Sequence, residues 1–431
     1  MTSEASPSVP VAELQDVIEL VIDHRGKTPK KLGGDFTSNG VPVISAIHIK
    51  DGRINWSERE RYVSEEMHRK WMPVRLREND ILLTSEAPLG EVAFVPSDDD
   101  LVLSQRLFAL RTKPDLMDSA FLKYFLSSAQ GQSELWNRAT GSTVLGIRQA
   151  ELMRVRVPVP ELGAQQRAGN LLRSIDQLID VNVSTSSILE SIAQTLFRSW
   201  FVDFDPVRAK MAGEKPVGMD DATAALFPDS VEESELGEIP AGWTVRGLPE
   251  LAEIQYGAPF ASKLFNSSGE GTPLLRIRDL KAQAPSTWTT ETHPKGFIAE
   301  AGDLLIGMDG EFNPTLWLGE NSYVNQRVCR VLPGNNVAKF FLYFSLIPVM
   351  RRIERGSTGS TVIHLGKSDL DTIKLLSPPV ELLDAYRQVV SPMLSQMVSL
   401  KSQNRALETM RDALLPRLIS GELQVPEDLV A

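Results

Sequence analysis

The hydrophobic and polar positions of this sequence predict two long helices. Between about Ala164 and Phe204, and again between about Leu382 and Ile419, apolar residues recur in alternating steps of four and three. This spacing is typical of helices that pair along a seam, as in a coiled coil. Each segment of about forty residues would extend roughly 60 Å as a helix, at about 1.5 Å per residue, a length suited to a spacer.

The predicted seam has a polar residue near the middle of each helix. In the first helix it consists of Leu171, Ile175, Leu178, Asn182, Thr185, Leu189, Ile192 and Leu196, and in the second of Val389, Met393, Gln396, Leu400, Gln403, Leu407, Met410 and Leu414. If the helices pair antiparallel with matched ends, Asn182 lies opposite Gln403, where a polar pair lowers stability but can define the register. Alternatively, each stripe packs only on its own domain.

The sequence outside these helices repeats itself in the same order. The matches are GVPVISAIHIKDG (40–52) with GTPLLRIRDLKAQ (271–283), NDILLT (79–84) with GDLLIG (302–307), LSQRLFAL (103–110) with VNQRVCRV (324–331), AFLKYFLSS (120–128) with KFFLYFSLI (339–347), RATGSTVLGI (138–147) with RGSTGSTVIHL (355–365), and VPVPELGAQQR (157–167) with SPPVELLDAYR (377–387). Matches in one order indicate an internal duplication. Short β-rich runs between Gly, Pro and Asn turns predict that each copy is an α+β domain.

We therefore expect two similar α+β domains and two long antiparallel helices, related by a pseudo-two-fold repeat. The expected boundaries are 1–160 for the first domain, 161–213 for the central helix, 214–240 for an acidic linker, 241–378 for the second domain and 379–431 for the C-terminal helix. The linker is expected because residues 219–239 contain many acids and no Lys or Arg, a composition typical of connecting segments.

Composition changes this picture only slightly. A chain of 431 residues with 42% hydrophobic and 23% charged residues is typical of a globular protein with more than one domain. The single cysteine, Cys329, excludes an internal disulfide and suits the reducing cytoplasm, where we expect it to be a small buried hydrophobe. The first ten residues predict no secretory signal. No metal site is expected, because CxxC is absent and the five histidines are scattered.

The formal net charge of −11 does not decide whether the chain binds DNA. Much of the negative charge falls in residues 219–239, and screening limits the reach of that segment to roughly 10 Å. Local basic clusters therefore matter more, and two are present, in DHRGKTPKK (23–31) and MRRIER (350–355). Arg and Lys in such clusters contribute salt-sensitive affinity for phosphates.

The motifs of common enzymes are missing from the sequence. LGKS (365–368) lacks the glycine that a phosphate-binding loop needs five positions earlier, where Thr361 stands. FNPT (312–315) lacks the second proline and the aromatic residue of the Asn-Pro-Pro-aromatic motif of amino-methyltransferases. There is also no GxSxG or HExxH. We expect a chain that recognises rather than catalyses.

The repeated loops are the best candidates for recognition. Each has an arginine beside Gly, Ser and Thr, whose hydroxyl and backbone N–H groups suit phosphate and base-edge contacts. The candidate DNA contacts are Arg138, Thr140, Ser142, Thr143, Arg355, Thr358, Ser360, Thr361, Arg25 and Lys27. The turns SEAPLG (85–90) and GMDGEF (307–312) occupy matching places, and Glu86 or Asp309 could accept a hydrogen bond from a cytosine amino group, although a structural turn role is the simpler interpretation.

The central segment AQTLFRSWFVDFDPVRAKMAG (193–213), the segment VPVPELGAQQR and the two-halves layout closely resemble the specificity subunits of type I restriction–modification systems. LPRLISGEL (415–423) is similar to that family's chain end. The resemblance covers nearly the whole chain. In the second copy Ala385 and Tyr386 replace Gln165 and Gln166, and Pro392 lies near the start of the predicted seam, where it would kink or delay the helix.

The resemblance implies a non-catalytic DNA-recognition subunit with two target-recognition domains, each reading one half of a split site. It implies that the helices set the gap between the half-sites. It also implies two methyltransferase subunits, which bring S-adenosylmethionine and flip adenines, and two motor-nuclease subunits, which use ATP and Mg²⁺. The sequence leaves open two other functions, a self-contained methyltransferase with fused recognition domains and a coiled-coil scaffold that does not bind DNA.

Overall fold

The computed structural model divides into two compact units. It describes residues 9–24, 26–56, 61–98, 100–141, 144–356 and 364–427. The first unit comprises residues 1–178 and 406–431, and the second comprises residues 179–405. The second unit is therefore inserted, along the chain, between two parts of the first.

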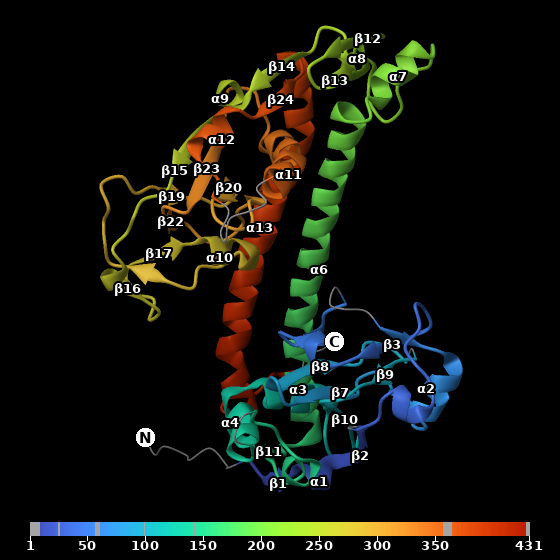
Figure 1. Ribbon diagram of the computed structural model, residues 1–431. Helices are drawn as coiled ribbons and strands as arrows, with labels where there is room; N and C mark the ends of the chain where they lie inside the picture. Colours follow the sequence, from blue (N-terminus) through green and yellow to red (C-terminus); the bar gives the residue numbers. More distant parts are fainter. Residues whose placement is uncertain are drawn as a thin grey trace. The chain divides into compact units, whose positions relative to one another are not determined.

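Both predicted long helices are present. Helix α6 is Leu162–Phe201 and helix α13 is Val380–Ile419, so each has 40 residues (Figure 1). Helix α6 ends before Phe204, which adopts a left-handed backbone conformation, and the short helix α7 (Asp205–Met211) starts beyond it with a proline in its first turn. Pro392 lies well inside α13 and does not delay its start.

The two helices are antiparallel in both units. In the second unit, the Asn182 side-chain amide donates to Asn404 Oδ1 at 2.8 Å, and the Tyr386 hydroxyl donates to the Ala193 carbonyl at 3.0 Å. In the first unit, Arg411 Nη1 donates to Asp176 Oδ1 at 3.0 Å. Along these contacts the residue numbers on α6 increase while those of their partners on α13 decrease, which confirms the antiparallel prediction.

The observed seam differs from the predicted one at every second position of the α13 stripe and at two positions of the α6 stripe, where the predicted residues are exposed. Asn182 faces Asn404, so the prediction that it faces Gln403 is wrong, and Gln403 is exposed. Leu178 is likewise 54% exposed, whereas Ile179 is 3% exposed. The buried stripes include Leu172, Ile175, Ile179 and Ala193 on α6, and Val390, Met397, Leu400 and Asn404 on α13, with Asn182 half-buried beside them. Neighbouring apolar residues such as Leu178 and Ile179 fit either phase of the alternating pattern, and packing against the domains selects one.

The other predicted seam residues are divided between buried and exposed positions. Ile175 and Leu400 are buried, and Thr185, Met393 and Leu407 are half-buried. Four more are half-buried against the cores, Leu171 and Leu414 in the first unit and Leu189 and Leu196 in the second. The exposed ones are Ile192, Val389, Gln396 and Met410.

In the first unit a four-stranded antiparallel sheet has the order β2-β10-β7-β8. These strands are β2 (Ile18–Asp23), β7 (Ile81–Ser85), β8 (Leu89–Phe94) and β10 (Leu107–Thr112). Smaller sheets are formed by β1 (Val11–Glu13) with β11 (Arg156–Pro158), by β6 (Tyr62–Val63), β3 (Val41–Ile44) and β9 (Val102–Leu103), and by β4 (Ile49–Lys50) with β5 (Arg53–Ile54). The helices include α1 (Leu14–Val17), α2 (Glu65–Trp71), α3 (Ser119–Ser127), α4 (Ala129–Asn137) and α5 (Gln149–Leu152).

The second unit repeats this topology. Its four-stranded antiparallel sheet has the order β15-β23-β20-β21, formed by β15 (Ala252–Tyr256), β20 (Leu304–Gly307), β21 (Pro314–Leu316) and β23 (Val328–Pro333). Strand β14 (Thr244–Gly247) pairs with β24 (Lys374–Ser377), as β1 does with β11. Strands β17 (Thr272–Leu275) and β22 (Ser322–Val324) are parallel, as are β3 and β9. The helices include α9 (Leu248–Leu251), α10 (Ile277–Ala282), α11 (Lys339–Gly356) and α12 (Lys367–Asp371). The predicted internal duplication is confirmed.

Each core is completed by parts of both long helices. Ala168 and Leu172 of α6 and Leu418 and Ile419 of α13 join the core of the first unit. In the second unit Trp200 and Phe201 pack against Tyr386, with ring centroids 5.8 and 5.0 Å apart. The aromatic end of α6 is therefore core. Cys329 is also buried there, and burial raises the pKa of its thiol to about 12.

The acidic stretch has more structure than its composition indicates. It contains α8 (Asp221–Ala225) and a hairpin of β12 (Val231–Ser234) with β13 (Gly237–Pro240). Phe227 and Ile239 are buried in the core of the second unit. A few apolar residues anchor this acidic stretch to the core. The prediction that residues 214–240 form only a linker is therefore wrong, because the stretch is folded onto the second unit. No helix in the described part of the chain is long and apolar enough to cross a membrane.

A buried ionic network joins α3 to both long helices in the first unit. Asp176 on α6 accepts from Lys123 at 3.3 Å, from the Tyr124 hydroxyl at 2.7 Å and from Arg411 on α13. Burial alone would raise the pKa of Asp176, but these donors outweigh it and hold the pKa below its usual value. The second unit has a related contact, in which Tyr343 of α11 donates to Glu190 of α6 at 2.8 Å. Tyr124 and Tyr343 are matching residues of the duplication.

Asn404→Ala should lower the thermal midpoint of the purified chain. The substitution leaves the Asn182 amide without its partner inside the seam, which costs about 1–3 kcal/mol. Gln403→Ala is the matched control and should change the midpoint little, because Gln403 is exposed and donates to Ser399 of its own helix. A larger effect for Gln403 than for Asn404 would contradict the observed register.

Asp176→Asn should destabilise the first unit in a pH-dependent way. At pH 7 it leaves the nearly buried Lys123 without its counter-charge, a loss of about 3 kcal/mol. The Asp176 pKa is lower in the folded state, so its stabilising effect is full above the unfolded pKa of about 3.9 and disappears as the pH falls through the folded value. The difference in thermal midpoint between wild type and Asp176→Asn should therefore be full at pH 7 and should narrow as the pH falls below about 3.9. Asp412→Asn, at an exposed acid beside Arg411, should have little effect at any pH.

Candidate nucleic-acid interface

The repeated loop contacts the repeated turn in both units. In the first unit the Ile147 N–H donates to the Ser85 carbonyl at 2.9 Å, and Glu86 pairs with Gly146 in an isolated bridge. In the second unit the Leu365 N–H donates to the Met308 carbonyl at 2.8 Å, and Asp309 pairs with His364. The same backbone pattern thus brings each loop beside the end of a central strand, β7 or β20.

An arginine and an acid form an ion pair at each of these places. Arg106, just before β10, has its Nε 3.0 Å from Glu86 Oε1. Arg327, just before β23, has its Nε 3.2 Å from Asp309 Oδ2, and its Nη1 donates to Asp309 Oδ1 at 3.3 Å. Arg106 and Arg327 match in the duplication, and each side chain is 54% exposed. We call these two groups the first and second arginine–acid pairs.

The predicted loop arginines have different surroundings. Arg138 follows α4, and its Nη2 donates to Glu134 one helical turn earlier at 3.3 Å, while its buried Nε has no partner among the residues that the structure describes. Its counterpart Arg355 is exposed in the last turn of α11, next to the exposed Arg351 and Arg352. A cation there suits the negative end of the helix dipole, and it is available to a phosphate.

The first basic cluster, residues 23–31, is connected to the first arginine–acid pair by one hydrogen bond. Gln105 donates to the Lys27 carbonyl at 3.4 Å, which places the Lys27 segment beside Arg106. The Lys27 ammonium donates to the Trp71 carbonyl at 3.0 Å, so it has a structural bond inside the domain. Thr140 closes the first loop by two backbone bonds to Gly146. Six predicted residues lie outside the described part of the chain: Arg25, Ser142, Thr143, Thr358, Ser360 and Thr361.

Sequence reasoning missed Arg106 and Arg327 as site residues. The Gln-Arg dipeptide was visible in the repeated LSQRLFAL and VNQRVCRV segments, where it served only to establish the duplication. Each arginine precedes a buried strand and is distant in sequence from its acid and from the loop. The sequence alone therefore does not reveal that they meet. Only the strand order, which places β10 beside β7 and β23 beside β20, brings arginine, acid and loop together.

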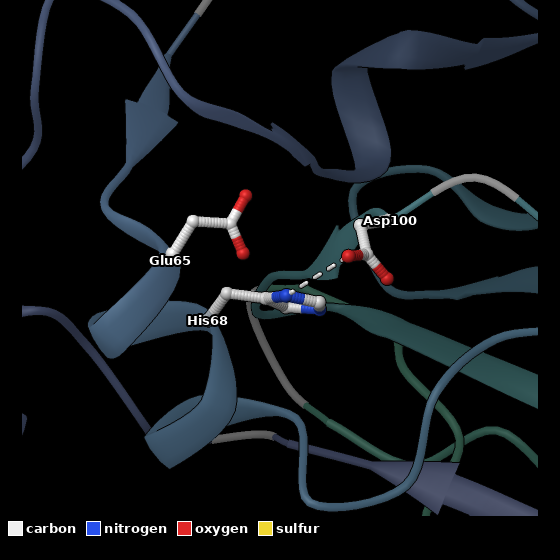
Figure 2. Close-up of side chains that lie close together, drawn as sticks. All are labelled: Glu65, His68 and Asp100. Atoms are coloured by element: carbon white, nitrogen blue, oxygen red, sulfur yellow. Dashed lines mark ion pairs between the residues drawn. The ribbon is translucent and has the colours of Figure 1, made fainter.

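One group of described residues could hold a cation. Glu65 and His68 project from α2 toward Asp100, and their ligand atoms lie within 4.8 Å of one another (Figure 2). His68 is 1% exposed, and within the described part of the chain neither of its ring nitrogens makes a hydrogen bond. Asp100 lies 3.8 Å from His68 Nδ1, and Arg75 lies 2.9 Å from its other oxygen. Ligand atoms around zinc lie roughly 3.3 Å apart, given bonds of about 2.0–2.2 Å, so the arrangement fits an Arg–Asp–His ion-pair chain better than a zinc site.

Comparisons with known proteins establish the family. Residues 9–190 and 240–390 match the model of the type I restriction modification DNA specificity domain, so the chain belongs to that family. It is 23% identical over 441 residues to the type I restriction enzyme MjaIX specificity subunit of Methanocaldococcus jannaschii, covering 97% of this chain and 94% of that one. It is 25% identical to the HindI specificity subunit of Haemophilus influenzae over 81% of this chain and 87% of the relative.

A solved structure shares the fold. The S subunit of a type I restriction–modification system from M. genitalium aligns over 97% of this chain and 98% of its own, with a TM-score of 0.56 and 15% identity. At that identity the likeness concerns the fold. It agrees with the predicted combination of two similar α+β domains and long antiparallel helices.

Asp100→Asn should lower the thermal midpoint, because the buried His68 ring and Arg75 both lose their carboxylate. EDTA should leave the wild-type midpoint unchanged, since no cation is needed to hold this ion-pair chain. A midpoint that falls in EDTA and recovers when Zn²⁺ or Mn²⁺ is added would instead identify Glu65, His68 and Asp100 as ligands. Glu66→Gln, at an exposed acid on the same helix, is the control variant.

Proposed function

We propose that this chain is the DNA-specificity subunit of a type I restriction–modification complex, and that each of its two recognition domains reads one half of a split DNA site. The observation that carries the proposal is the duplicated surface: loop, turn and arginine–acid pair recur at the same ends of two sheets with one topology. Membership of the DNA specificity family supports the same function.

The proposed recognition domains are residues 1–160 and 241–378. Residues 161–213 and 379–431 then supply the spacer helices, and residues 214–240 connect the halves. Two helices of 40 residues, paired antiparallel, are suited to fix the gap between half-sites, because spacing in a protein sets half-site separation on DNA. The relatives are named as specificity subunits of restriction enzymes, which supports a non-catalytic role in a larger assembly.

The proposed partners are double-stranded DNA, two methyltransferase subunits and two motor-nuclease subunits. Methyl transfer and cleavage, with S-adenosylmethionine, ATP and Mg²⁺, then belong to those partners, and this chain supplies target choice. Arg351, Arg352 and Arg355, exposed at the end of α11, are suited to phosphate contacts. Charge neutralisation there should weaken binding to all DNA sequences alike.

The full chain, expressed with its methyltransferase subunit in a host lacking adenine modification, should produce methylated adenines in a split motif with a fixed gap. Long-read sequencing of the genome measures this directly. A continuous motif, or modification that persists without this chain, would contradict the proposal. As a control, the purified chain alone should not bind S-adenosylmethionine in calorimetry; binding would favour the self-contained methyltransferase.

A further inference from the structure

The two arginine–acid pairs occupy equivalent positions in the backbone of the two units. The Ser85 N–H donates to the Arg106 carbonyl at 2.8 Å, and the Met308 N–H donates to the Arg327 carbonyl at 2.9 Å. Each arginine therefore extends the ladder between two central strands by one residue. Its Cα position is set by a buried sheet and not by a loose surface loop, which is the support a specific contact needs.

In both units the acid lies beside the Nε of its arginine. Glu86 lies at the Nε of Arg106, and Asp309 lies at the Nε and Nη1 of Arg327. This arrangement orients the planar guanidinium and leaves N–H groups on both Nη atoms for another acceptor pair. A bidentate arginine contact to guanine O6 and N7 uses such a fork, and a nearby carboxylate can accept from the amino group of the paired cytosine.

The charge of the pairs argues against a simple phosphate contact. An arginine and the carboxylate beside it have almost no net charge together, so the pair would release few counterions from DNA. Phosphate binding would be served better by the exposed arginines at the end of α11, since no carboxylate in the described part of the chain pairs with Arg351, Arg352 or Arg355. The neutral, half-exposed pairs are better suited to reading a pattern of donors and acceptors.

The two pairs also differ in ways that suit different targets. Gly146 lies beside Glu86 in the first unit, and a Cβ there would come within 3.0 Å of the Ser85 carbonyl oxygen. His364 takes that position in the second unit, with Nδ1 2.5 Å from Asp309 Oδ1. The acid of the first pair is thus a glutamate next to a glycine, and the acid of the second is an aspartate that contacts a histidine side chain.

Resting on the proposed function, we propose that Arg106 and Arg327 are specificity-determining residues, each reading the guanine of one G·C pair in its own half-site while Glu86 or Asp309 fixes the guanidinium. The two half-sites then each contain one position that depends on one arginine. The pair as a unit, with donors from arginine and an acceptor from the acid, matches the major-groove edge of a G·C pair.

The test compares wild-type, Arg106→Gln and Arg327→Gln full-length chains, each co-expressed with the methyltransferase subunit and mapped by long-read sequencing. Each variant should relax one G·C position in one half of the motif by roughly 10- to 100-fold, and the two variants should affect opposite halves. Variants that change the same half, both halves, or neither would overturn the inference, as would a half-site without a G·C pair.

Lysine variants separate geometry from charge. Arg106→Lys and Arg327→Lys keep the positive charge but lose the planar fork, so they should relax the same positions as the glutamine variants. Wild-type specificity in the lysine variants would overturn the inference. Arg75→Gln is the matched control, because Arg75 is also an exposed arginine paired with an acid in the first unit, but it lies at Asp100, and the motif should not change.

Salt dependence separates base reading from phosphate binding. Fluorescence anisotropy of the intact complex on a duplex carrying the wild-type motif should give the same slope of log K against log salt for wild type and Arg106→Gln. A slope reduced by about 1 would mean a lost phosphate contact and would overturn the inference. If the wild-type chain gives no split motif, the proposed function itself fails. If wild type gives one and both glutamine variants keep it, only the role of the arginines fails.

Discussion

The antiparallel pairing of α6 and α13 is the constraint on which the rest of the structure depends. The first unit is built from two separate stretches of chain, and the second brings together residues from near the two ends of its single stretch. The first unit needs Leu172 from α6 and Leu418 from near the end of the chain, and the second needs Phe201 from α6 and Tyr386 from α13. Hydrophobic burial, which dominates folding, therefore couples the ends of the sequence to its beginning and middle. The Asn182–Asn404 pair sets the register of this coupling.

Duplication explains how one chain acquires two recognition surfaces. The four-stranded sheets have the same strand order and the same backbone bonds at Arg106 and Arg327 in both units, because they belong to buried structure that tolerates little change. The side chains around those bonds differ, as Gly146 and His364 do. Loops on a rigid scaffold can vary without cost to the core, which is how one fold serves different targets.

The negative net charge is compatible with a role in DNA recognition for a structural reason. The acidic stretch forms a hairpin anchored to the second unit by Phe227 and Ile239. At the candidate interfaces, Glu86 and Asp309 are used to hold arginines. The exposed arginines at the end of α11 remain as a local positive surface, and local charge governs the approach of a polyanion.

The sequence by itself determined the two long helices and the duplication, because helical periodicity is a local property and the repeat is written in the residues. It also predicted the loops at Arg138 and Arg355 as candidate DNA contacts. Only the tertiary structure decided which of the adjacent residues Leu178 and Ile179 is buried, and that Asn404 and not Gln403 meets Asn182. Two neighbouring sets of positions on each helix fit the alternating four/three spacing, and only packing against a partner surface selects one of them. The arginine–acid pairs likewise join residues far apart in sequence, and strand pairing alone brings them into contact.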